Sequence, residues 1–395
     1  MANVAILGYG TVGSGVYEII KNNARGKINA NGEEINVTRV LDLREFPDHP
    51  EKEIFTKDFD DILNDGKISV VAEAMGGLHP AYEFTKALLE AGKNVVTSNK
   101  ELVATYGTEL LALAKEKNLN YMFEASVGGG IPVIRPMHQC LTANNVLRIA
   151  GILNGTTNYI LHQMIEYGKT FEAALLEAQE KGFAERNPAA DVEGHDACRK
   201  IAILASLASG KFVDYKDIPT EGITNITAED VKYAGKLGYS IKLIGYLKDM
   251  GGKLYSTVCP MFVPKDCPLS DVNGVFNAVL ITGDSVGDVM FYGKGAGKLP
   301  TASAIVADVI DCVKHINTSK KILWTEPEEN IMYPTDEVKF RYFIRTNNAE
   351  IAAKFKSCSE VSDVVPGEIG LITDYMKESE IKALNLGVSA IKVLD

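Results

Sequence analysis

The stretch of sequence that ends at Lys200 gathers acidic residues and one lysine in an order that suits proton transfer. Four residues separate Asp196 from Lys200, so the two share one face of the helix predicted there. Glu185 and Asp191 lie in the preceding loop, which leads onto that face. The stretch therefore predicts three carboxylates and one ammonium close together.

This group of side chains suits the reduction of an aldehyde. A proton must reach the carbonyl oxygen as hydride reaches the carbon. Lys200, its charge held by Asp196, can donate that proton, and Glu185 and Asp191 can bind the ammonium of an amino acid substrate. The alternative is an ordinary surface ion pair between Asp196 and Lys200, which is the commoner role for such a pair.

A glycine-rich turn near the N-terminus suits the carrier of the hydride. Gly8, Gly10 and Gly13 follow a strand-like run and open a helix. Their positions allow a tight turn, close approach of the backbone to a pyrophosphate, and close packing of helix on strand. The helix start at Thr11 and Val12 then offers N–H groups to phosphates. The pattern predicts a bound dinucleotide, and a glycine turn without a ligand is the alternative.

Two charged residues after the second predicted strand bear on the choice between NAD and NADP. Asp42 can accept hydrogen bonds from a ribose 2′-hydroxyl and so favour NAD, whereas Arg44 can pair with a 2′-phosphate and favour NADP. Both can equally be solvated loop charges. The sequence leaves this choice open.

The elements that must position these residues begin with alternating strands and helices. This alternation over the first 130 or so residues predicts a parallel, doubly wound, Rossmann-like α/β sheet. The predicted strands are Val4–Leu7, Val37–Leu41, Val70–Ala74, Val95–Thr97 and Tyr121–Glu124, and the predicted helices are Val12–Asn22, Phe59–Asn64, Pro80–Ala91 and Lys100–Lys117.

The pattern changes near Arg148 to that of an α+β substrate and dimerisation domain. Strands are predicted at 146–153, 239–248, 254–262 and 277–283, with helices at 158–166, 171–181 and 194–209. The helix 301–315 is expected to pack back onto the first domain. The predicted domains are 1–131 with about 296–316 for the dinucleotide, 132–295 for the substrate, a linker at 317–335, and a small ferredoxin-like domain at 336–395.

Composition limits the classes of function. A net charge of −11 argues against a nucleic-acid partner, and no apolar run approaches the roughly 20 residues that span a bilayer. Met1 is followed directly by a strand-like segment without a basic and apolar leader. The six cysteines are scattered and contain no C-x-x-C pair. These features predict a cytoplasmic enzyme.

The same acidic stretch resembles the signature of homoserine dehydrogenases, A-x3-G-hydrophobic-small-x2-N-P-x2-D-V-x-G-x-D-x3-K. The matching positions are Ala178, Gly182, Phe183, Ala184, Asn187, Pro188, Asp191, Val192, Gly194, Asp196 and Lys200. The resemblance extends from residue 1 to about 316 and includes the glycine turn and the segments 97–100, 124–132, 154–158 and 293–301. So many fixed positions make a chance match very improbable.

The resemblance implies a reaction and roles for particular residues. Members of this family reduce aspartate 4-semialdehyde to homoserine with NAD or NADP. It implies that Lys200 is the proton donor, with Asp196 as a catalytic or orienting carboxylate and Glu185 as a substrate ligand. Lys100 resembles the family lysine between nicotinamide and substrate, and Gly297 the glycine that approaches the dinucleotide.

The resemblance also implies a monovalent cation, sodium, in the loop that starts at Glu124. The ligands would be the carboxylate of Glu124 and the backbone carbonyls of Val127, Gly129 and Ile131. Family members are commonly homodimers. Many end in an ACT-type domain that binds an amino acid effector. Here that domain is shorter than usual. It also looks degenerate, since its first turn, residues 345–349, lacks the usual proline-glycine pair.

Two rival functions differ from this one in the residues they need. Aspartate semialdehyde dehydrogenase acts by acyl transfer and needs a cysteine nucleophile beside a histidine, but Cys140 has no histidine motif. A catalytically inactive dinucleotide-binding sensor would not need Lys100, Glu185, Asp191, Asp196 and Lys200, all of which are present.

Overall fold

The computed structural model describes residues 2–22, 34–316, 318–355, 358–384 and 390–395. The chain divides into two compact units. The first contains residues 1–143, 202–214 and 293–328, and the second contains 144–201, 215–292 and 329–395. No helix in the described ranges combines the length and the apolar character needed to cross a membrane.

The first unit is built on a six-stranded sheet in the order β3-β2-β1-β4-β5-β6, with every pair parallel. This is the order of a doubly wound dinucleotide-binding sheet, so the predicted Rossmann-like fold is confirmed. The strands are β1 (Ala2–Leu7), β2 (Ile35–Leu41), β3 (Phe55–Thr56), β4 (Ile68–Glu73), β5 (Asn94–Thr97) and β6 (Tyr121–Met122).

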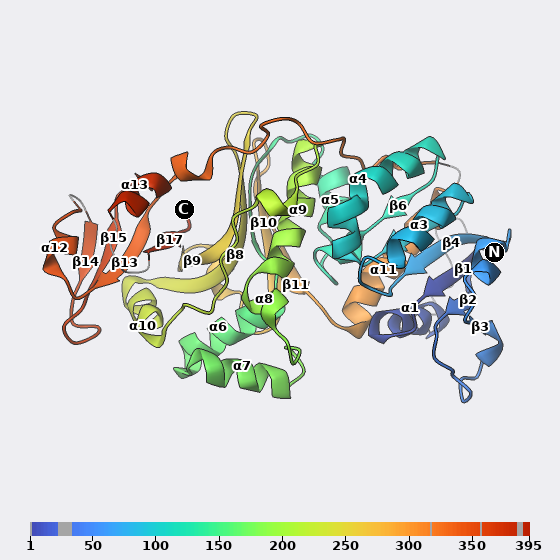
Figure 1. The fold of residues 1–395 in the computed structure, drawn as a ribbon, viewed down its shortest axis with the longest axis horizontal. Coiled ribbons are helices and arrows are strands. Elements are labelled where there is room, and N and C mark those ends of the chain that lie inside the picture. The colour runs from blue at the N-terminus through green and yellow to red at the C-terminus, as the bar shows by residue number, and fades with distance from the viewer. Residues whose placement is uncertain (1, 23–33, 317, 356–357, 385–389) are drawn as a thin grey trace. The chain divides into compact units, whose positions relative to one another are not determined.

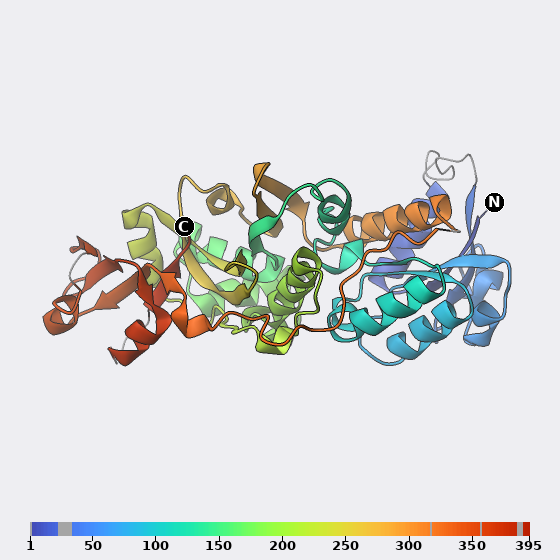
Figure 2. The same cartoon turned by 90° about the horizontal axis from the view of Figure 1, so that it is seen from above.

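Helices cover both faces of this sheet, and for that reason its central strands β1 and β4 are mostly apolar rather than alternating. Helices α1 and α11 pack together on one face, and α3 and α4 pack together on the other (Figure 2). The helices of this unit are α1 (Thr11–Asn22), α2 (Asp60–Leu63), α3 (Ala81–Glu90), α4 (Lys100–Glu116), α5 (Ile134–Gln139) and α11 (Lys298–Lys314).

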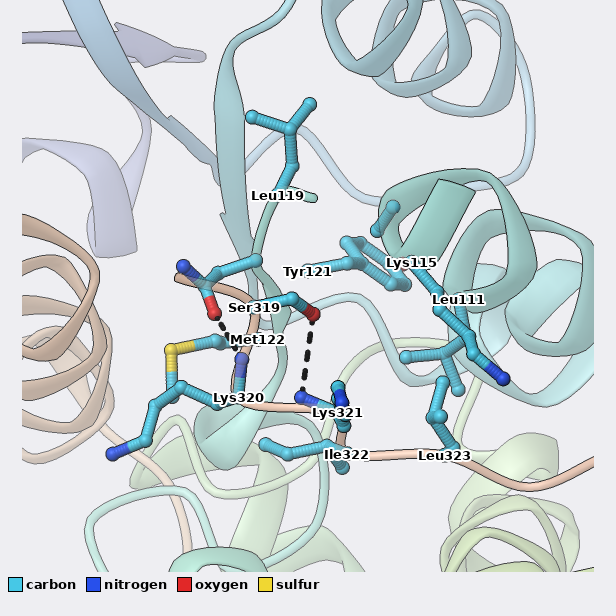
Figure 3. A pocket seen from close by; sticks show the side chains of 12 residues that line it. Leu111, Lys115, Leu119, Tyr121, Met122, Ser319, Lys320, Lys321, Ile322 and Leu323 are labelled. Atoms are coloured by element: carbon cyan, nitrogen blue, oxygen red, sulfur yellow. Dashed lines mark hydrogen bonds between the residues drawn. The ribbon is translucent and has the colours of Figure 1, made fainter. Parts of the chain in front are cut away.

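The segment after α11 returns along α4 and β6, where the sequence predicted a linker (Figure 3). Trp324 is 3% exposed, and its indole N–H donates to the hydroxyl of Thr108 at 2.9 Å. The backbone N–H of Lys320 donates to Asn120 Oδ1 at 2.8 Å. The pocket in Figure 3 between this segment and α4 has about 10 Å³ of open volume, which is too small for a substrate.

The second unit is built on a nine-stranded mixed sheet in the order β11-β10-β7-β8-β9-β17-β13-β15-β14. Strands β8 and β9 pair antiparallel along eleven residues each, as the sequence predicted for this region. The strands are β7 (Val146–Ile152), β8 (Tyr239–Asp249), β9 (Leu254–Pro264), β10 (Phe276–Gly283), β11 (Gly287–Lys294), β13 (Tyr342–Thr346), β14 (Cys358–Val361), β15 (Ile369–Thr373) and β17 (Ala390–Val393).

The helices of the second unit begin at polar side chains that cap their N-termini. Asn154, Thr170 and Thr227 each accept a hydrogen bond from a backbone N–H in the first turn of the helix that follows. The helices are α6 (Gly155–Tyr167), α7 (Phe171–Glu180), α8 (Ala189–Val192), α9 (His195–Ser209, whose later residues belong to the first unit), α10 (Ala228–Leu237), α12 (Ala349–Ala352) and α13 (Glu378–Ala383).

The C-terminal residues extend the sheet of the second unit. Strands β17-β13-β15-β14 follow the 4-1-3-2 order of a ferredoxin-like βαββαβ unit, and β17 pairs parallel with β9. Side chains of β8 and β9 share one buried cluster with Phe340, Ile344 and Leu371. A short two-stranded ribbon, β12 (Lys339–Phe340) with β16 (Met376–Lys377), lies in the same segment.

Candidate active site

Lys200 and Asp196 form a buried ion pair on α9. Lys200 Nζ donates to Asp196 Oδ2 at 2.8 Å and to the carbonyl of Leu153 at 2.8 Å. Lys200 is 8% exposed and Asp196 is 4% exposed. Few lysines are this buried unless a carboxylate pairs with them. The pair is therefore not the solvated surface pair that was the alternative at the level of sequence.

Asn154 joins the two aspartates of this cluster. It lies between β7 and α6, and its Nδ2 donates to Asp191 Oδ1 at 2.7 Å and to Asp196 Oδ2 at 2.9 Å. Asp191 is on α8, which packs beside α6 (Figure 1). Together with Lys200, these residues form one hydrogen-bonded group from the turn between β7 and α6 and from helices α8 and α9. The sequence stretch 154–158 was part of the resemblance, but no role followed from it.

Glu185 lies apart from this group. It follows α7 in an exposed turn, where its backbone carbonyl accepts a hydrogen bond from Gln179 Nε2 at 3.0 Å. Across the ranges that the structure describes, the Glu185 carboxylate makes no hydrogen bond to Asp191, Asp196 or Lys200. Two of the three predicted carboxylates thus contact the lysine group directly or through Asn154, while the third remains in solvent.

The glycine turn of the first unit has the close packing that the sequence predicted. Gly8 has φ = +87°, a conformation that strongly favours glycine, and its N–H donates to the carbonyl of Leu41. A Cβ on Gly13 would lie 1.9 Å from the carbonyl oxygen of Gly8, so only glycine fits there. No protein atom lies near a Cβ built on Gly10, which leaves that side of the turn open. Thr11 and Val12 start α1 directly after the turn.

Asp42 and Arg44 hold each other at the end of β2. Arg44 Nε donates to Asp42 Oδ1 at 2.9 Å and Nη2 to Oδ2 at 2.8 Å, while the N–H of Tyr9 donates to Oδ2 at 2.8 Å. The hydrogen bonds from Arg44 are the main reason that the pKa of Asp42 falls to about 2. The carboxylate is therefore ionised, and its lone pairs are already engaged.

A pocket of about 470 Å³ lies beside this pair, and its size suits the adenosine end of a dinucleotide. It includes Lys57, which the sequence reasoning did not single out because it follows the two-residue strand β3. The lining residues are Gly8, Gly10, Leu41, Asp42, Leu43, Arg44, Lys57, Phe59, Ala74, Met75, Pro80 and Phe84. Most of this lining is apolar, as a purine needs, and it also includes the cations of Arg44 and Lys57.

Lys100 is the first residue of α4, at the carboxyl edge of the first sheet where such sheets bind ligands. A buried carboxylate, Glu73, stabilises this edge. It accepts the hydroxyl of Thr97 at 2.5 Å and the N–H of Met75 at 2.8 Å. Thr97 in turn accepts the N–H of Asn99, the residue that caps α4. Burial raises the pKa of Glu73, and these hydrogen bonds oppose that rise.

The sequence reasoning missed Glu73, although a charged residue at the end of an otherwise apolar strand was a signal for it. Gly297 is at the N-terminus of α11, with φ = +125°. The next residue, Lys298, pairs with Glu18 of α1 at 2.7 Å. The glycine thus allows the chain to turn sharply into a helix that packs on the glycine-turn helix.

The predicted cation ligands lie between β6 and α5. Glu124 is 3% exposed and accepts backbone N–H groups from Val133, Ile134 and Arg135 at 2.6 to 2.8 Å, at the start of α5. A carboxylate has about four lone-pair positions, so this one keeps room for one further partner. In the described part of the chain, no hydrogen bond reaches the other predicted ligands, the carbonyls of Val127, Gly129 and Ile131. This all-oxygen donor set suits a hard cation.

Comparison with known proteins identifies relatives of the whole chain. A sequence model of homoserine dehydrogenase matches residues 132–310, and one of the homoserine dehydrogenase NAD binding domain matches residues 8–124. The homoserine dehydrogenase of Bacillus subtilis (strain 168) is 40% identical over 365 residues, which cover 91% of this chain and 84% of that protein.

Solved structures give the same result. A homoserine dehydrogenase from Thiobacillus denitrificans has a TM-score of 0.89 at 35% identity and covers 100% of this chain and 98% of its own. A hyperthermophilic archaeal homoserine dehydrogenase in complex with NADPH has a TM-score of 0.66 at 30% identity, and covers 79% of this chain and 98% of its own.

Proposed function

Because the chain belongs to the homoserine dehydrogenase family, we propose which of its residues carry the reaction of that family. The protein is a nicotinamide-dependent oxidoreductase that interconverts aspartate 4-semialdehyde and homoserine. Hydride moves between the cofactor and the carbon of the aldehyde, so the protein must bind both molecules and supply or remove one proton at the oxygen.

Lys200 is the proton donor in this proposal, and its buried ion pair with Asp196 carries the argument. The ammonium is oriented by Asp196 Oδ2 and the Leu153 carbonyl, both at 2.8 Å. It gives a proton to the carbonyl oxygen during reduction, and as a neutral amine it takes the hydroxyl proton of homoserine during oxidation. Lys100, at the carboxyl edge of the dinucleotide sheet, would contribute a positive charge near the bound nicotinamide.

Glu185 is the ligand of the substrate ammonium in this proposal. Its carboxylate is exposed and makes no contact with the Lys200 group in the described residues, so it can pair with a ligand. Asp191 serves the same end from α8, where Asn154 fixes it in place. These two carboxylates would favour an amino acid substrate over a simple aldehyde.

NADP(H) is the cofactor that the geometry favours. Asp42 is engaged by Arg44 and Tyr9, so it offers little to a ribose hydroxyl. Arg44 and Lys57 line the same pocket and can both turn toward a 2′-phosphate. The archaeal relative solved with NADPH shows that this family includes NADPH binders.

A monovalent cation and a second subunit complete the proposal. Sodium would be held by Glu124 with the carbonyls of Val127, Gly129 and Ile131, and would fix the loop between β6 and α5. The rate measured in sodium chloride, compared with the rate in tetramethylammonium chloride, tests this cation site.

The homodimer would form through the edge strand β11, where Met290 and Tyr292 are 39% and 52% exposed on one face. The mass in solution of Tyr292→Glu beside the wild type tests the dimer.

The experiment for the central claim replaces Lys200. Lys200→Ala should lower kcat for aldehyde reduction by about 100- to 10,000-fold, the usual contribution of a general acid, with little change in NADPH affinity. Lys200→Arg is the matched variant, because it keeps the charge beside Asp196 but does not release a proton near neutral pH. It should also be inactive. Near-full activity of Lys200→Ala, or rescue by arginine, would show that the lysine is not the acid.

A further inference from the structure

Asn154 occupies a special place in the acid–base group, because it contacts both aspartates and also begins a helix. Its side chain is 6% exposed. Oδ1 accepts the backbone N–H of Thr157 at 2.9 Å, which caps α6. Nδ2 has two hydrogens, and the two aspartate contacts, at 2.7 and 2.9 Å, use both of them.

These contacts fix the orientation of the amide. If the amide were turned over, its oxygen would face the carboxylates of Asp191 and Asp196, and its NH₂ group would face the N–H of Thr157. Both contacts would be repulsive. The N-cap of α6 and the bridge between the aspartates therefore depend on one side chain in one orientation, which buried surroundings make costly to change.

The electrostatics of the bridge follow from the same distances. Within the described part of the chain, the titratable groups that contact the amide are Asp191 on α8 and Asp196 on α9. Two carboxylates that share one amide raise each other's energy. The amide N–H groups stabilise both. Asp196 Oδ2 is shared between Asn154 Nδ2 at 2.9 Å and Lys200 Nζ at 2.8 Å. Asn154 and Lys200 thus both donate to the same carboxylate oxygen, so the amide affects the charge that Asp196 presents to the ammonium.

We propose that Asn154 is a positioning residue that holds Asp191 and Asp196 in one geometry and thereby sets how tightly Lys200 keeps its proton. The proposal rests on the role of Lys200 given above. Asn154 touches neither aldehyde nor cofactor in this scheme. It acts through Asp196 on the acid, and through Asp191 on the carboxylate offered to the substrate.

Two substitutions separate the bridge from the helix cap. Serine and aspartate both serve well at an N-cap, so Asn154→Ser and Asn154→Asp keep the start of α6. Serine is too short to bridge the aspartates. Aspartate replaces the donor with a third carboxylate, which favours the charged form of Lys200. Thr170→Ala is the matched control, because it removes an N-cap in the same unit, at α7, without touching the group.

The measurement is the pH dependence of kcat for homoserine oxidation, with the cofactor KM determined in parallel. Asn154→Ser should lower kcat at least tenfold, because a displaced reacting group costs up to about a hundredfold. Asn154→Asp should move the rise of the profile to higher pH by about one unit. The cofactor KM should not change in either variant, and Thr170→Ala should keep the wild-type profile.

Other outcomes are equally decisive. Wild-type kcat and profile in both Asn154 variants would overturn the inference, and so would a loss of kcat with no movement of either profile. Thermal unfolding of each variant shows whether a loss reflects misfolding, and the aspartate variant decides the question if the serine variant is unstable. Lys200→Ala is measured beside them. If it stays active, the proposed function fails, whereas an inactive Lys200→Ala with wild-type-like Asn154 variants removes only the inference.

Discussion

The carboxylate of Asp42 accepts N–H groups from Tyr9 and from Arg44, and this pairing shows how one residue can govern the choice of cofactor. A ribose 2′-hydroxyl can bind Asp42 only if Arg44 moves away. A 2′-phosphate would attract Arg44 away from Asp42. Because Lys57 lines the same pocket, the phosphate could pair with two cations. The sequence identified Asp42 and Arg44 as the residues on which the choice between NAD and NADP depends. Only the structure shows that their side chains bind each other.

Arg44→Ala should therefore raise the KM for NADPH and leave that for NADH unchanged or lower. The loss of a hydrogen bond between charged groups costs roughly 1.5–3 kcal/mol, which corresponds to a tenfold or greater rise in KM. Steady-state kinetics with both cofactors measure the ratio. Arg39→Ala, on the same strand, is the control, because the described contact of its guanidinium is the neighbouring carbonyl of Thr38. An equal rise for both cofactors would count against this role.

The predictability of the site residues depends on their separation in sequence. Asp196 and Lys200 are four residues apart on a helix, so helical geometry alone predicted their contact, which the structure has at 2.8 Å. Asn154 is 42 residues from Asp196, and their contact exists only because the turn between β7 and α6 lies beside the first turn of α9. Glu185 was predicted in the same cluster from its place in a loop, and loops do not fix the direction of a side chain.

At the scale of elements, hydrophobic periodicity identified the long elements and missed those that lack it. Strands β7 to β10 and helices α1, α3, α4, α6, α7 and α9 lie close to their predicted positions. Helix α10 was missed although Thr227 and Asp230 form a capping box at its start, which was a readable signal. Strand β11 was missed because it is an exposed edge strand with few buried side chains. The two-residue β3 spans only one strand period, so it is too short to show any alternation.

The buried lysine Lys242 forms hydrogen bonds to several elements of the second unit. Lys242 on β8 is 1% exposed. Its Nζ donates to the carbonyl of Val272, to Asn273 Oδ1 and to Asn158 Oδ1, at 2.5, 3.1 and 3.3 Å. It thereby joins β8 to α6 and to the loop before β10. Burial is the main reason that the pKa of Lys242 falls to about 8.

Lys242→Met should change how stability depends on pH. The folded protein gives up this proton near pH 8 and the unfolded chain near 10.5, so between these values the unfolded chain binds more protons. Stability due to Lys242 therefore rises with pH in this window, by at most roughly 3 kcal/mol. The Tm of the wild type minus that of Lys242→Met should therefore rise between pH 7.5 and pH 10. Lys248→Met, exposed on the same strand, should show a constant difference, and a constant difference for Lys242→Met would refute the argument.

At the scale of the whole molecule, the question is whether residues 336–395 form a domain of their own. The order of strands and helices predicted one, and this stays a prediction. Local patterns show which elements exist, but they do not show which sheet edges those elements join. In the structure β17 continues the sheet from β9, and Arg345 pairs with Asp230 of α10 at 3.1 Å as well as with Glu368. The buried cluster runs through both parts without a gap.

Ile344→Ala tests whether this continuity makes the second unit one cooperative structure. Ile344 is fully buried and lies opposite Leu371 of β15 and Ala390 of β17. Its truncation should lower the free energy of unfolding by about 2–4 kcal/mol. If the unit unfolds as a whole, hydrogen exchange of the amides in β8 and β9 should accelerate by the factor that this loss predicts. Leu176→Ala, 58% exposed on α7, should leave those rates unchanged. If exchange accelerates only within residues 336–395, this segment opens independently, and the shared core does not couple its unfolding to that of β8 and β9.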